Sequence, residues 1–364
     1  MTIAIIGDPH LGKISADQIK KDKIAESQKL FFEYLRSFCS DNDIKELIWT
    51  GDIFDNNRNV DSSVIQYGVG LFHDMFGDCT HHVILGNHCL YERGNLKITS
   101  LTCIQHLPNV NLYKKPTKVK LLNHNFLFTP YLVPSLFTKF SNNIESLGKN
   151  NDVIVGHFDI IGATTENGRN STVGLDMNKL LNNVHLTISG HYHNVSKYVR
   201  GENKIQYVGS PYQLTFGDAE QTRGFWTINE HLKLNFYENK VSYKFVHLDN
   251  ESILKYDTLN NYFIECSYPS NLNEDEHFKL NKLIEQKTPI SFRTIPKDIT
   301  SIDDICSTTS EDEQEIANEM SEAINIGDML KVCEVYEEAV PPKNKKIVDK
   351  LLLDIRNKVK DKTK

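Results

Sequence analysis

Five short segments of the chain share one form: a run of apolar residues, then a glycine, then a side chain that can bind a metal ion. These segments are residues 3–10, 47–52, 83–88, 153–157 and 184–193. The apolar runs are typical of buried strands, and the polar side chains follow at the strand ends. We therefore expect the fold to bring five strand ends to one place.

The polar residues of these segments offer oxygen and imidazole nitrogen, and no thiolate. The candidate ligands are Asp8, His10, Asp52, Asn87, His157, His191 and His193. Mixed carboxylate, amide and imidazole ligands suit two first-row cations such as Mn²⁺ better than a structural zinc site. Two ions about 3.5–4 Å apart, bridged by a carboxylate, can clamp a phosphoryl group during in-line displacement. His88 would remain free to act on the leaving oxygen.

Each segment alone is weak evidence. A Gly-His pair such as Gly156-His157 is more often a turn than a ligand, and the nine histidines that belong to no motif are expected to be structural or surface residues. The presence of all five segments argues against chance. We expect Cys89 to be a neutral neighbour of the site rather than a nucleophile.

Strand-like and helix-like patterns alternate up to about residue 248, which predicts an α/β fold. Apolar residues at helical spacing predict helices over about 23–39 and 63–76. Short strands are expected within 110–128 and over 205–208, 224–229 and 233–237. Because no G-x-G-x-x-G motif is present, a two-sheet sandwich with flanking helices fits better than a dinucleotide-binding sheet.

Four parts are expected along the chain. Residues 1–248 would form the metal-binding domain, and 249–300 a small strand–helix–strand domain with its helix over 274–286. Residues 301–325 lie in a strongly acidic stretch and are predicted to be a linker. Residues 326–364 are predicted to be a helical tail.

The predicted tail has an apolar stripe at helical spacing. Its candidate partner-binding residues are Ile347, Leu351, Leu352 and Ile355. A helix with one apolar and one basic face suits docking into a groove of a partner protein. Two alternatives are a helix folded back on its own domain and a basic tail that binds DNA.

The composition sets limits on location and on partners. The seven cysteines are scattered without a C-x-x-C pair, which indicates reduced thiols in a cytoplasm. No apolar run approaches the about 18 residues of a membrane span, and we see no signal peptide. The net charge of −7 gives no general attraction to nucleic acid, so DNA binding would need local basic patches and bound cations.

The five segments resemble, in order, the signature of calcineurin-like metallophosphoesterases: D-x-H, G-D-x-x-D, G-N-H, G-H and G-H-x-H. Within that superfamily, residues 1 to about 230 are similar to SbcD-type nuclease subunits of DNA double-strand-break repair, in particular the recombination endonuclease subunit of tailed phages. This closer resemblance is carried by residues 7–12, 51–55, 207–212, 217–218 and 223–226.

The resemblance implies a two-sheet metallophosphoesterase sandwich flanked by helices, a small α/β capping domain that orients DNA, and a C-terminal helical tail. It also implies two Mn²⁺ ions, with Mg²⁺ as the alternative. One ion would be held by Asp8, His10, Asp52 and His193, and the other by Asp52, Asn87, His157 and His191. His88 would be the catalytic histidine, and Asp55 would orient it.

The implied function is that of a Mn²⁺-dependent DNA nuclease with 3′→5′ exonuclease and single-strand endonuclease activity. It would act at DNA ends in recombination and repair, as a homodimer with an SMC-like ABC ATPase, in the cytoplasm (of the host, if the chain comes from a phage). Arg58, Tyr91 and Arg93 follow ligand segments and are expected to contact DNA.

Two other functions remain open. A protein phosphatase or small-molecule phosphodiesterase of the same superfamily is one, but such phosphatases usually show G-D-x-x-D-R-G and G-N-H-E. Here residues 51–57 are GDIFDNN and residues 86–89 are GNHC. The other is a non-catalytic scaffold that tethers DNA. The complete ligand set and His88 argue against it.

Overall fold

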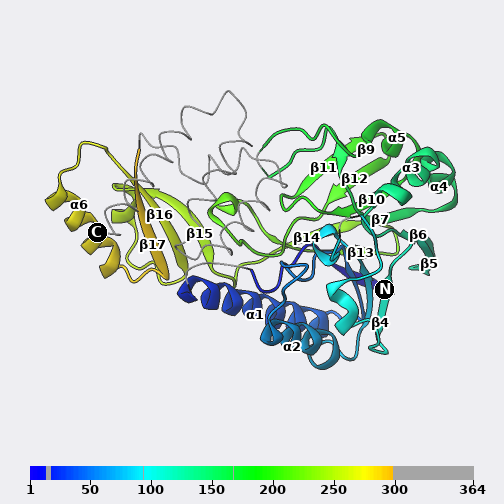
Figure 1. Ribbon diagram of the computed structural model, residues 1–364, viewed down its shortest axis with the longest axis horizontal. Coiled ribbons are helices and arrows are strands. Elements are labelled where there is room, and N and C mark those ends of the chain that lie inside the picture. The colour runs from blue at the N-terminus through cyan, green and yellow to red at the C-terminus, as the bar shows by residue number, and fades with distance from the viewer. Residues whose placement is uncertain (14–17, 93, 167, 298–364) are drawn as a thin grey trace, which may run out of the picture. The chain divides into compact units, whose positions relative to one another are not determined.

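The computed structural model describes residues 1–13, 18–92, 94–166 and 168–297 (Figure 1). The predicted acidic linker 301–325, the predicted tail 326–364 and the candidate DNA contact Arg93 lie outside the described residues. The same holds for the candidate partner-binding residues Ile347, Leu351, Leu352 and Ile355. No helix in the described part of the chain is long and apolar enough to cross a membrane.

Two six-stranded sheets form the larger part of the structure. The first has the order β14 (Leu234–Glu238), β13 (Gly224–Asn229), β1 (Thr2–Ile6), β2 (Glu46–Trp49), β3 (Thr80–Ile84) and β4 (Val110–Tyr113). The second has the order β11 (Ser196–Arg200), β12 (Asn203–Tyr207), β10 (Leu186–Gly190), β7 (Val153–His157), β6 (His124–Phe128) and β5 (Thr117–Leu121). Strands β1 to β4 are parallel to one another, as are β6, β7, β10 and β12.

Successive residues of the central strands face opposite sides of each sheet. The four layers are therefore helices, the first sheet, the second sheet and helices. Ile3 and Ile5 of β1 pack with Val153 and Val155 of β7 in the apolar layer between the sheets. The residues between them, such as Ala4, join a second core with α1 (Gln18–Asp41). A third core covers the outer face of the second sheet with α3 (Pro134–Asn142), α4 (Ile144–Asn150) and α5 (Met177–Asn183). The predicted two-sheet sandwich flanked by helices is confirmed.

The helix predicted over 63–76 has an interruption. α2 (Ser62–Gly70) is followed at once by η1 (Leu71–Met75), one turn of π-helix. The change occurs where Leu71 and Phe72 enter the core beside α1. Gly68 lies against Phe54, since a Cβ there would lie 2.7 Å from its ring. Periodicity could predict the helix but not this local change in winding.

A three-stranded parallel sheet of β15 (Lys244–Asp249), β16 (Tyr262–Tyr268) and β17 (Ser291–Pro296) follows the sandwich. α6 (Glu274–Gln286) begins at a capping box between Asn273 and Glu276 and buries Leu280 and Ile284 against this sheet. β15 belongs to this small sheet, although most of it precedes the predicted border at 248/249. The division into domains stays a prediction.

Short elements complete the described chain. They are the strands β8 (Ile160–Ile161) and β9 (Leu175–Asp176) and the 3₁₀ turns η2 (Asn87–Cys89), η3 (Ser100–Cys103), η4 (Phe216–Asp218) and η5 (Ser252–Lys255). The paired strands β8 and β9 come directly after β7, and η2 begins at a predicted metal ligand.

Candidate metal centre

The seven candidate ligands come together at the carboxyl ends of β1, β2, β3, β7 and β10. Asn87 Oδ1 lies 2.8 Å from His157 Nε2 and 3.1 Å from His191 Nδ1. Asp52 Oδ2 is 3.2 Å from His157 Nε2, and Asp8 Oδ1 is 3.6 Å from His157 Nδ1. The structure thus brings together the strand ends that the sequence singled out. The remaining candidates, His10 and His193, belong to the same cluster, with their Nε2 atoms 3.0 Å apart.

The backbone in this region is unusual. His10, Asp52 and His191 have φ values of 43°, 44° and 92°, in the left-handed region that residues other than glycine seldom adopt. Such conformations cost free energy and concentrate at functional sites, where the surrounding fold holds them in place.

Two glycines of the motifs lie so close to a candidate ligand that a side chain would not fit there. A Cβ on Gly86 would lie 2.1 Å from Asp52 Oδ1, and one on Gly190 would lie 2.5 Å from Asp8 Oδ1. Any larger residue would displace a candidate ligand. The glycine that precedes each of these ligand segments therefore makes room for a carboxylate from another strand.

The two buried carboxylates have opposite electrostatic environments. Burial raises the pKa of Asp8 to about 6. Burial alone would also raise the pKa of Asp52, but His157 and other nearby histidines hold that pKa well below its ordinary value. Asp8 Oδ1 is buried and has no hydrogen-bond partner among the described residues. A buried carboxylate oxygen without a partner is costly unless a cation compensates it.

Fixed hydrogen bonds turn acceptor atoms toward one another. His157 Nδ1 donates to the main-chain oxygen of Thr50 over 2.8 Å, so its Nε2 directs a lone pair at Asn87 Oδ1 and Asp52 Oδ2. A proton or a metal ion between these atoms offsets the repulsion between their lone pairs. Burial lowers the pKa of His157, but Asp52 and Asp8 raise it more, so the net pKa is above its ordinary value. The two carboxylates therefore favour a positive charge at this position.

A second group of acceptors lies around His10 and His193. His10 Nδ1 is 3.2 Å from Asp55 Oδ1, and a proton on that nitrogen leaves His10 Nε2 directed at His193 Nε2. Burial and the neighbouring His10 hold the pKa of His193 well below its ordinary value, so this imidazole stays neutral. Neutral imidazoles are the form that binds metal ions.

The donor set fits two divalent cations. It combines two carboxylates, one amide and four imidazoles, and several of their lone pairs converge. These side chains contact one another directly, and no three His, Cys, Asp or Glu side chains in the described ranges already have the spacing of a formed metal site. The fit therefore rests on the chemistry of the donors and on the unpartnered oxygen of Asp8.

His88 lies at the edge of this cluster and is partly exposed. Its ring centroid is 5.0 Å from that of His10. Nδ1 donates to the main-chain oxygen of Asp55 over 2.8 Å, so the contact between these two residues does not use the Asp55 carboxylate. That carboxylate instead pairs with Lys13 over 3.1 Å and with His10.

Cys89 is fully buried beneath the candidate ligands. Its Sγ accepts from Gly86 N and lies 3.9 Å from Asp52 Oδ1. Burial raises the pKa of the Cys89 thiol far above its ordinary value, so the sulfur is a neutral neighbour of Asp52 rather than a nucleophile.

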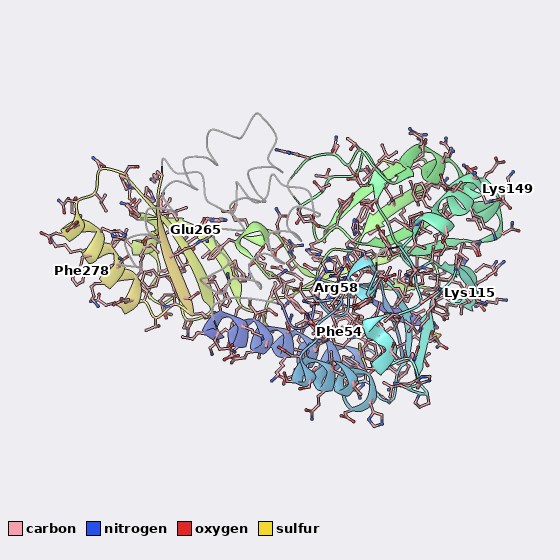
Figure 2. All side chains as sticks on the ribbon, viewed as in Figure 1. Phe54, Arg58, Lys115, Lys149, Glu265 and Phe278 are labelled. Carbon is pink, nitrogen blue, oxygen red and sulfur yellow. The ribbon has the colours of Figure 1, made fainter. Side chains whose placement is uncertain are left out.

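Two of the three candidate DNA contacts lie together at the surface. Arg58 is exposed and is labelled in Figure 2. Its guanidinium lies 5.8 Å from the centre of the Tyr91 ring. Arg58 comes from the loop after Asp55, and Tyr91 from the segment after His88. The two loops that carry Asp55 and His88 therefore also carry an exposed cation and an exposed aromatic ring.

Other residues that touch the candidate ligands were not predicted. Asp159 Oδ1 lies 2.8 Å from His191 Nε2, and Glu166 Oε1 accepts from His193 N over 2.9 Å. Arg223 pairs with Asp218 over 2.6 Å and donates to Asn194 Oδ1, beside His193. Asp159 and Glu166 are 32 and 27 residues from these partners in sequence, so no local spacing could reveal the contacts. Asp218 and Arg223, by contrast, lie in segments that carried the closer resemblance. The one local indication was that Asp159 lies two residues after the candidate ligand His157 in the chain.

The chain belongs to the calcineurin-like phosphoesterase family, whose profile matches residues 1–195. Members of this family generally use two divalent metal ions. The chain is also 27% identical over 228 residues to a protein named exonuclease subunit 1, from Enterobacteria phage T4. The match covers 62% of this chain and 64% of that protein, which is less than two thirds of the relative's length.

Two solved structures give weaker likenesses. One is described as GAP50, the anchor in the inner membrane complex of Plasmodium, with a TM-score of 0.38, 13% identity, and coverage of 83% of this chain and 99% of that one. The other is a dimetal phosphatase from Danio rerio, with a TM-score of 0.43, 10% identity, and coverage of 67% and 99%.

Proposed function

We propose that this chain is the nuclease subunit of a DNA-processing complex and hydrolyses phosphodiesters at DNA ends with two bound Mn²⁺ ions. The observation that carries the proposal is the convergence of seven oxygen and imidazole donors at the strand ends. The similarity to a phage exonuclease subunit points to DNA as the substrate.

The proposed ligands divide into two sets that share Asp52. One set is Asp8, His10, Asp52 and His193, and the other is Asp52, Asn87, His157 and His191. Two divalent ions bound there would supply Lewis acidity to the phosphoryl group and activate the attacking water. The chain's own part is to hold these donors rigidly, and the hydrogen bonds from His191 N to Asp8 and from His88 N to Asp52 support this.

His88 would exchange a proton with the leaving oxygen through Nε2. Its Nδ1 proton is engaged by the main-chain oxygen of Asp55, which leaves Nε2 as the nitrogen that can face a substrate. The partial exposure of His88, next to the buried Asn87, suits a residue that touches substrate rather than metal. Asp55 would orient His88 through its backbone.

Arg58 and Tyr91 would contact the DNA strand near the reacting phosphate. A net charge of −7 opposes the approach of DNA, so local cations are needed to offset the repulsion. An exposed tyrosine can stack on an unpaired base, and an arginine can contact its phosphate.

The small sheet with α6 would orient the duplex. The chain would act as a homodimer with an SMC-like ABC ATPase.

A nuclease assay tests this function. End-labelled single-stranded and duplex DNA would be incubated with the protein in Mn²⁺, Mg²⁺ or chelator, beside a phosphoprotein and a simple phosphomonoester. We expect cleavage of DNA that requires divalent metal and proceeds best with Mn²⁺. Preferred hydrolysis of the phosphoprotein would support the phosphatase alternative, and no metal-dependent hydrolysis of any substrate would support the scaffold.

The Asp52→Asn variant links the assay to the site. Because Asp52 is the proposed bridge, this variant should lose affinity for both ions and should not cleave DNA. Asp74→Asn, a change at a well-exposed carboxylate on η1, is the matched control and should behave as the wild type. Normal binding of two Mn²⁺ ions by Asp52→Asn would show that the bridge is wrongly assigned.

A further inference from the structure

The Asp159 carboxylate lies behind His191, on the side away from the other candidate ligands. Its Oδ1 is 2.8 Å from His191 Nε2, and it also accepts from the hydroxyl of Tyr192 over 3.3 Å. The other ring nitrogen, His191 Nδ1, lies 3.1 Å from Asn87 Oδ1. The imidazole is therefore held between a carboxylate on one side and the proposed metal centre on the other.

The backbone around Asp159 fixes this carboxylate. Asp159 joins β7 to the short strand β8, and its main-chain oxygen accepts from Leu175 N of β9 over 2.8 Å. Gly174, with φ +109°, makes this approach possible, because a Cβ there would lie 2.1 Å from Asp159 O. The pair β8 and β9 thus sets the position of Asp159 relative to β7 and its ligand His157.

The contact decides which nitrogen of His191 carries the proton. A carboxylate only accepts, so Nε2 must donate, and a neutral ring then has a lone pair on Nδ1. His157 has the opposite arrangement, because its Nδ1 donates to Thr50 O and its Nε2 faces Asn87. The two imidazoles therefore approach Asn87 Oδ1 through different nitrogens.

We propose that Asp159 is a positioning residue that locks His191 in the tautomer with Nδ1 free, so that His191 binds its metal ion through Nδ1. This inference rests on the proposed function, since it concerns an ion at that site. Carboxylates behind metal-binding histidines fix the tautomer and increase the basicity of the ligand, and their loss costs about 10–100-fold in metal affinity.

The Asp159→Asn variant separates this role from simple support of the loop. An asparagine amide has nearly the same shape, but its NH₂ group can donate to His191 Nε2 and so favour a proton on Nδ1. We expect Mn²⁺ titration of the metal-free variant to show one ion bound as in the wild type and the other about 10–100-fold weaker. Tyr192→Phe is the matched control: it removes the other side-chain contact of the same carboxylate and should leave both affinities unchanged.

A spectroscopic measurement reads the tautomer without any metal. In metal-free protein labelled with ¹⁵N-histidine, at a pH where imidazole is neutral, His191 of the wild type should have its proton on Nε2. In Asp159→Asn the proton should move to Nδ1. A wild-type His191 with its proton on Nδ1 would overturn the inference, even if Asp159→Asn proved unable to fold.

The outcomes distinguish this inference from the proposed function. If the wild type binds two Mn²⁺ ions and Asp159→Asn binds them equally well, the positioning role is wrong and the proposed function stands. If the wild type binds no Mn²⁺, the proposed metal centre is wrong, and metal ligation by His191 is wrong with it.

Discussion

His88 donates from Nδ1 to the main-chain oxygen of Asp55 over 2.8 Å, while the Asp55 carboxylate pairs with other residues. That carboxylate lies 3.2 Å from His10 Nδ1 and 3.1 Å from Lys13 Nζ. One residue thus supports the proposed catalytic histidine through its backbone and a proposed metal ligand through its side chain. The two effects can be separated by mutation.

Replacing Asp55 by alanine should weaken metal binding while leaving the support of His88 in place. The variant loses the carboxylate 3.2 Å from His10 Nδ1, whose charge favours a proton on that nitrogen. We therefore expect about a 10–100-fold weaker affinity for the ion that His10 binds. Cleavage at low Mn²⁺ should fall accordingly and recover as Mn²⁺ is raised. A defect that saturating Mn²⁺ does not relieve would show that the carboxylate acts on His88 or on the substrate.

Replacing His88 by alanine should have the converse result. Both Mn²⁺ ions should remain bound, because His88 is assigned to proton transfer and not to ligation. DNA cleavage should fall by about 10²–10⁴-fold, the usual contribution of a positioned acid or base. Metal analysis and a cleavage assay on the same preparation test this. Loss of both ions together with activity would contradict the assigned role.

The Tyr91 ring should matter for DNA and not for small esters. It is exposed, lies near Arg58, and follows His88 closely in the chain. Stacking of a base on an aromatic ring contributes about 1–3 kcal/mol, so Tyr91→Ala should raise KM for single-stranded DNA by about 5–150-fold. The hydrolysis of a small phosphodiester should not change. Val199→Ala, at an exposed apolar side chain on β11, is the control. An equal loss on both substrates would place Tyr91 in the catalytic machinery instead.

The sequence carried enough information for the sandwich and for the convergence of ligands, because both depend on strands that end in short motifs. Ile3 and Ile5 alternate with Ala4 and Ile6, so β1 could be recognised as a strand with apolar residues on both faces. The carboxyl ends of neighbouring parallel strands meet at one edge, which is why Asp8, Asp52 and Asn87 come together. This part of the prediction required only local patterns.

The contacts behind the ligands could not be predicted in this way. Asp159 meets His191 because β7 and β10 pair in register, with His157 beside Gly190. That register depends on the tertiary fold and leaves no trace in residue spacing. The same reason applies to Asp55: the motif gives the residue but not which of its atoms contacts His88.

His81 gives a prediction for stability, away from the metal centre. It is fully buried, accepts from Trp49 Nε1 at Nδ1 over 3.1 Å, and donates from Nε2 to Phe76 O over 3.1 Å. Both nitrogens are used by the neutral ring, and burial lowers the pKa of His81 from 6.5 to about 4. As the pH falls below 6.5, the unfolded chain binds a proton at His81 that the folded chain does not bind until about pH 4.

The stabilisation from a neutral His81 is therefore present above pH 6.5 and is lost progressively as the pH falls toward 4. The loss amounts to about 3 kcal/mol of the free energy of unfolding at the lower limit. The measurement is urea unfolding at a series of pH values with chelator present, for the wild type and for His81→Gln, whose side chain does not titrate. The wild type should be the more stable protein at neutral pH, and its advantage should shrink steadily with acid, because the other titrating groups are common to both proteins. A difference in stability that stays constant across this range would show that His81 titrates as it does in the unfolded chain.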